Sequence, residues 1–79
     1  MDLCLEMQLN GKGTIGAPAK IQGAKLEALV GLRPEETLLV RKTVGGKPVV
    51  ARVSRDEVYQ LDQWEELLVV TCLAVITCR

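Results

Sequence analysis

Apolar and polar residues alternate along the first nine positions of the chain, and a period of two predicts a strand with one buried face. Asn10-Gly11 follows, and this dipeptide is typical of tight hairpin turns, so we expect a return strand from Thr14 to about Ala17. Pro18 lacks an amide N–H, which favours a place for that strand at a sheet edge. The apolar, core-facing positions of the first strand are Leu3, Leu5, Met7 and Leu9.

The apolar spacing changes to three and four residues between Ile21 and Leu32, which predicts one short helix. Gly31 is expected to end this helix, because glycine adopts the left-handed conformation without a Cβ clash. Pro34 follows shortly and prevents the helix from resuming. The residues expected on the buried face are Leu26, Leu29 and Val30.

The second half of the chain contains further strand-like segments, with a turn at Gly45-Gly46. The last segment is continuously apolar, which suits a strand in the middle of a sheet, and the first strand is its natural parallel neighbour. The order of elements predicts an α+β protein with a β-grasp fold, in which a mixed sheet of four to five strands packs on one helix. The expected segments are Thr37–Lys42, Val49–Val53, Val58–Leu61 and Leu67–Thr71.

The composition favours a single small domain without catalytic chemistry of its own. The chain has 79 residues, one Trp, one Tyr and no Phe, so its core must be aliphatic. Ten Lys and Arg balance ten Asp and Glu, so bulk charge favours neither nucleic acid nor an anionic membrane as a partner. Histidine, the commonest general base and metal ligand, is absent. We therefore expect no enzymatic activity, no cofactor and no metal.

The three cysteines are Cys4, Cys72 and Cys78, an odd number without zinc-site spacing. The chain begins Met1-Asp2, with an acid where a secretion signal would carry basic residues. Both observations favour a reducing, cytoplasmic location. We expect Cys4 to be a small apolar side chain inside the first strand, and all three thiols to be unreactive because no histidine can activate them.

Twelve residues from Leu67 to Cys78 carry no charge, too few to cross a bilayer as a helix. We expect a domain over residues 1–72 and an apolar tail over residues 73–79. Three alternatives remain open for the tail: packing on the domain, adding a strand to a partner or to a second copy of the chain, or disorder. The candidate docking residues are Leu73, Val75 and Ile76.

Two other features have alternative interpretations. The cations Arg41, Lys42, Arg52 and Arg55 form either a basic patch or ordinary solvated surface charge. Trp64 is either a packing residue or a contact residue for a partner.

Five short motifs follow one another between about residues 5 and 70: Leu9-Asn10-Gly11-Lys12, Ile21-x-Gly23-x-x-Leu26-x-x-Leu29-x-Gly31, Arg33-Pro34-Glu35-Glu36, Asp56-Glu57-Val58-x-x-Leu61, and Trp64-Glu65-Glu66-Leu67-Leu68-Val69-Val70. In this order the chain resembles bacterial ubiquitin-like domains of the multi-ubiquitin type. The resemblance implies a ubiquitin-like β-grasp fold and a role as a protein modifier. It also implies three kinds of partner: an activating enzyme, a conjugating enzyme with a catalytic cysteine, and a metallopeptidase.

On this resemblance we expect a modifier in a bacterial conjugation-like pathway, with Cys78 and Arg79 as its conjugation or processing terminus. Such modifiers typically end in Gly-Gly, because glycine lets the backbone approach an enzyme closely. Here no Gly-Gly follows Gly46. This favours an alternative, a noncovalent binding module that docks through its sheet face and apolar tail. A sulfur carrier, which also needs a Gly-Gly end, is a third possibility.

Overall fold

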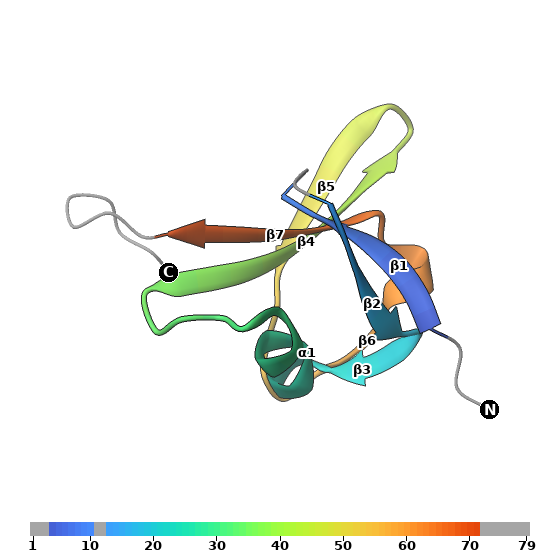
Figure 1. Cartoon of the computed structure of the whole chain (residues 1–79). Coiled ribbons are helices and arrows are strands. Elements are labelled where there is room, and N and C mark those ends of the chain that lie inside the picture. Colours follow the sequence, from blue (N-terminus) through green and yellow to red (C-terminus); the bar gives the residue numbers. More distant parts are fainter. Residues whose placement is uncertain (1–3, 11–12, 72–79) are drawn as a thin grey trace.

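The computed structural model describes residues 4–10 and 13–71 (Figure 1). Five strands form a mixed sheet in the order β2-β1-β7-β4-β5, and β3 pairs with β6 in a separate two-stranded sheet. With one α-helix this is the α+β, β-grasp-like arrangement expected from the sequence, and the main sheet has five strands. The elements are β1 (Cys4–Leu9), β2 (Thr14–Pro18), β3 (Lys20–Gln22), α1 (Gly23–Val30), β4 (Glu36–Val44), β5 (Lys47–Arg52), β6 (Val58–Gln60), a 3-10 helix η1 (Leu61–Gln63) and β7 (Glu66–Thr71).

The first and last strands lie side by side at the centre of the sheet. They pair in parallel, with Gln8 opposite Glu66 and Leu9 opposite Leu67. On its other side β7 pairs antiparallel with β4 over its whole length. Parallel neighbours need a crossover connection, and the segment that contains α1 belongs to it. The predicted central position of the last strand is confirmed.

The alternation in β1 matches the observed burial. Met7 is buried and Leu5 and Leu9 are half-buried, while the even positions are exposed. Cys4 lies in the strand as expected, and its even position turns it to the solvent side of the sheet, where it is exposed. β2 pairs only with β1 among the described strands, so Pro18 lies in an edge strand as predicted.

Helix α1 ends as the sequence predicts. Gly31 is left-handed with φ 68°, and the N–H of Leu32 donates to the carbonyl of Glu27 at 3.0 Å. Leu26 is fully buried, but Leu29 is 42% exposed, so its predicted place on the buried face was wrong. Gly23 and Leu26 are the buried residues of α1 and Val30 is half-buried against the core, so Leu29 lies outside the buried face of this short helix.

The start of α1 is held by the backbone of the segment after β5. The N–H of Gly23 donates to the carbonyl of Glu57 at 2.8 Å, and the N–H of Ala24 donates to the carbonyl of Arg55 at 3.1 Å. A Cβ on Gly23 would lie 1.9 Å from the carbonyl oxygen of Ser54. The side chain of Gln22 makes no capping hydrogen bond. The two backbone hydrogen bonds replace it, because they satisfy N–H groups at the helix start that have no partner within the helix.

The core lies between the main sheet, α1 and the small β3–β6 sheet. Its buried residues are Met7, Ala17, Ile21, Leu26, Leu38, Val40, Val53, Tyr59, Leu61 and Leu67. Within the described ranges no helix is long and apolar enough to span a membrane. The predicted boundary after residue 72 and the tail 73–79 lie outside the described residues.

Candidate functional site

The candidate docking residues of the tail and the expected conjugation or processing terminus lie beyond β7. Leu73, Val75 and Ile76, and the expected terminus Cys78 and Arg79, fall outside the described residues. The described part of the chain does contain the place from which they follow, the end of β7 at Thr71. The surroundings of that strand end are therefore the first candidate site.

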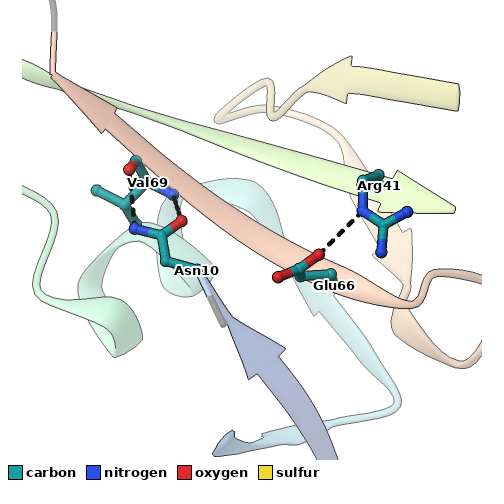
Figure 2. Close-up of polar contacts among 4 residues, drawn as sticks. All are labelled: Asn10, Arg41, Glu66 and Val69. Atoms are coloured by element: carbon teal, nitrogen blue, oxygen red, sulfur yellow. Dashed lines mark hydrogen bonds and ion pairs between the residues drawn. The ribbon is translucent and has the colours of Figure 1, made fainter. Parts of the chain in front are cut away.

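Asn10 fastens the end of β7 to the body of the protein (Figure 2). Its Nδ2 donates to the carbonyl of Val69 at 2.9 Å, and the N–H of Val69 donates to its Oδ1 at 2.8 Å. Its backbone N–H donates to the carbonyl of Leu67 at 3.0 Å. The side-chain amide thus replaces a peptide group and extends the β1–β7 ladder beyond the end of β1. Asn10 has φ 52°, a left-handed conformation that asparagine tolerates better than most residues.

A groove lies beside this contact, with a volume of about 400 Å³. Its apolar lining comes from Leu9, Val30 and Val69, one residue each from β1, α1 and β7. Arg33 and Glu36 contribute its polar lining, and the N–H of Arg33 donates to Glu36 Oε1 at 2.9 Å. The volume lies within the range of about 300–1,000 Å³ typical of sites that hold small-molecule ligands. The end of β7 therefore lies next to a hollow with apolar and polar walls.

The solvent-facing side of the main sheet is a second candidate site. Leu38, Val40 and Leu67 point into the core, so their chain neighbours Leu39 and Leu68 point away from it. Leu39 and Leu68 are directly opposite each other on β4 and β7. Four residues form this apolar outer patch: Leu39, Leu68, Val50 and Val70.

The outer patch has a charged border and a recognisable sequence signal. Arg41 and Glu66 are cross-strand neighbours on the same side of the sheet, and Arg41 Nε lies 2.9 Å from Glu66 Oε1 (Figure 2). The signal is the pairing of adjacent leucines, Leu38-Leu39 and Leu67-Leu68, which makes both faces of two strands apolar. The sequence interpretation had named the sheet face without these residues.

The four cations do not form one patch. Arg41 pairs with Glu66, and Arg55 Nε lies 3.5 Å from Glu27 Oε1 across the start of the helix. Lys42 points to the core side of the sheet, where its Nζ lies 4.5 Å from the centroid of the Trp64 ring. Trp64 is half-buried, as the packing interpretation expects.

A second hollow of about 340 Å³ lies between α1 and the ends of β4 and β5. Its lining includes Glu27 and Arg55, which pair with each other, above an apolar floor that includes Leu32 and Val53. Arg52 also lines this hollow and has no ion pair within the described residues.

Among the described residues, no group of three or more His, Cys, Asp or Glu is arranged to hold a metal ion. The described cysteine, Cys4, is free and exposed on the outer side of β1, next to Gly16. Comparisons of the chain with protein-family models, with curated proteins and with solved structures found no match.

Proposed function

We propose that this protein is a ubiquitin-like modifier in a bacterial, cytoplasmic conjugation-like pathway. One observation carries the proposal: β7 runs along the centre of the sheet and is fastened by Asn10 just before it ends. This arrangement gives the segment after β7 a fixed starting point on the folded body. An enzyme that grips the body would then receive that segment at a defined position.

The chemistry of the proposed modifier resides in a carboxylate at Cys78-Arg79, or in one exposed after trimming by a metallopeptidase. The carboxylate attacks the α-phosphate of ATP, which gives an acyl-adenylate and releases pyrophosphate. A cysteine thiolate of the partner enzyme then attacks the acyl carbon and displaces AMP, which forms a thioester. The protein itself acts as substrate and supplies recognition surfaces.

The test is to incubate the full chain and ATP with an activating enzyme encoded beside it, and to measure intact mass. We expect an adenylate, and a thioester on the enzyme that a thiol reductant reverses. A chain truncated after Thr71 is the matched control, because it keeps every described strand. If the full chain gives no adenylate, thioester or amide adduct, the modifier proposal is wrong.

The outer patch favours a second candidate function, a noncovalent binding module. Leu39 and Leu68 are apolar, half-buried, and covered by no described element. A partner that binds here would co-purify with the chain without any covalent bond. Leu39→Asp should abolish that co-purification, whereas Thr43→Asp, on the same strand and face but outside the patch, should preserve it. Equal effects of the two variants would contradict this function.

A further inference from the structure

Strand β5 has one free edge, because among the described strands only β4 pairs with it. The N–H of Val53 donates to the carbonyl of Leu38 at 2.9 Å, and the register places Arg52 opposite Leu39. Hydrogen-bonded pairs alternate along an antiparallel ladder, so the peptide groups of Val49 and Ala51 also face β4. The N–H groups of Val50 and Arg52 therefore point away from the sheet, as do the carbonyls of residues 48 and 50, whereas the carbonyl of Arg52 accepts a hydrogen bond from Tyr59 Oη at 3.5 Å.

The hairpin that carries this edge is basic. Residues 37–55 hold five of the ten cations of the chain and none of its ten acids. Three of these cations already have partners: Arg41 with Glu66, Arg55 with Glu27, and Lys42 with the Trp64 ring. The other two, Lys47 and Arg52, are the end residues of β5 and have no ion pair within the described ranges.

Two exposed valines lie between those unpaired cations. Val49 is 38% exposed on one face of β5, and Val50 is 50% exposed on the other. The hairpin extends beyond the rest of the sheet, and α1 lies well away from its tip (Figure 1). β5 therefore presents free peptide groups, an apolar middle and a positive charge at each end.

We propose that the free edge of β5 binds an extended peptide segment of another protein, with an apolar centre and acidic ends, as a sixth strand of the main sheet. The added strand receives hydrogen bonds from Val50 and Arg52, packs its apolar centre on the two valines, and places its acids near Lys47 and Arg52. Pro48 lacks an N–H and removes one donor from the edge, which limits the registers that a partner can adopt.

The other edge of the sheet fits such a partner less well. Strand β2 carries no charged residue and no large exposed apolar side chain. It therefore lacks both the charge and the apolar contact that β5 offers.

The peptide site does not depend on the proposed modifier function. Activation concerns the segment after β7, and peptide binding concerns an edge strand on the far side of β4. A negative activation assay would not contradict the peptide site, and a negative peptide-binding assay would not contradict the modifier function.

The test uses the full chain and a labelled synthetic peptide with a valine–isoleucine centre and glutamates at both ends. Amide hydrogen exchange by NMR is the informative measurement. We expect the amides of Val50 and Arg52 to gain protection when the peptide binds. The amides of Val49 and Ala51 should change little, because they already bond to β4. Binding should also weaken as salt rises, since charge pairs at the surface are screened.

Two variants test the contacts separately. Val50→Pro removes an outward N–H without breaking a bond to β4, and should weaken peptide binding about tenfold. Val50→Thr keeps the N–H and the branched Cβ, and is its matched control.

Arg52→Glu should weaken binding about fivefold or more, whereas Lys20→Glu on β3 makes the same charge change elsewhere and should have little effect. Thermal unfolding checks that each variant folds.

Four outcomes would overturn the proposal. The first is equal binding of a peptide whose glutamates are replaced by lysines, and the second is protection that appears on β2 instead. The third is protection of the same amides by a second copy of the chain in the absence of peptide, and the fourth is their stronger protection by a single-stranded oligonucleotide. The last two outcomes would assign the edge to self-association or to nucleic acid.

Discussion

Asn10 shows how one side chain can continue a sheet after its strand has ended. The amide group has one donor and one acceptor in nearly the geometry of a peptide unit, and both are used on Val69. The sequence predicted only the local part of this, the turn at Asn10-Gly11. The contact with Val69 was not predictable, because the two residues are 59 positions apart and no local pattern connects them.

Replacing Asn10 should separate its two contributions. Asn10→Ala loses both side-chain hydrogen bonds and puts an unfavourable residue at a positive φ, so we expect a loss of about 2 kcal/mol in the free energy of unfolding. Asn10→Gly loses the bonds but relieves the backbone, and should cost about 1 kcal/mol. Urea unfolding measures both. A glycine variant less stable than the alanine variant would contradict the backbone part of this explanation.

Among the elements, α1 and its neighbours show where sequence patterns stop being informative. Gly31 marked the end of the helix correctly, because a left-handed cap is a local requirement. Leu29 was assigned wrongly, because the spacing of apolar residues gives a face but not its width. Strand β3 was not anticipated at all: it has three residues, and it exists because β6 lies opposite it.

The helix start should be sensitive to a single methyl group. Gly23→Ala places a Cβ against the Ser54 carbonyl, so the segment or the helix must shift, and we expect a loss of about 2–3 kcal/mol in unfolding free energy. Gly31→Ala is the matched control, because a Cβ there meets nothing within 4 Å and costs only about 1 kcal/mol of left-handed strain. Chemical denaturation compares the two. Equal losses would mean that the close approach at Gly23 is unimportant.

The segment after β5, which binds the start of α1, also makes a hydrogen bond to a residue of β6. The backbone N–H of Ser54 donates to Tyr59 Oη at 2.5 Å, and the ring of Tyr59 is buried in the core. Tyr59→Phe keeps the ring and removes the acceptor, and should cost about 1 kcal/mol. Hydrogen exchange at the Ser54 amide should accelerate more than exchange in β4. A uniform acceleration across the molecule would indicate a general loss of stability instead.

For the whole molecule, the order of elements was predicted better than the surface. The alternation in β1 and the apolar run in β7 were enough to place both strands at the centre, because buried strands have strong patterns. The outer patch and the basic hairpin were seen only as general possibilities. Their residues come from three strands, and only the register of the folded sheet brings them together.

Removal of residues 73–79 tests the role expected for the apolar tail. All described strands end by Thr71, so the shortened chain should still unfold cooperatively. If the tail is a docking segment, its removal should raise solubility or lower the oligomeric state, as measured by sedimentation. Unchanged solubility and oligomeric state would contradict the docking interpretation.

The parallel pairing of β1 with β7 also constrains how this protein can be made in a cell. The ribosome releases β1 early, but β1 can pair with β7 only after nearly all the described chain has been synthesised. Until then the apolar side of the β1–β2 hairpin has no complete core to cover it. We therefore expect the main sheet to form late in synthesis, and the exposed apolar side of the hairpin to favour aggregation until it does.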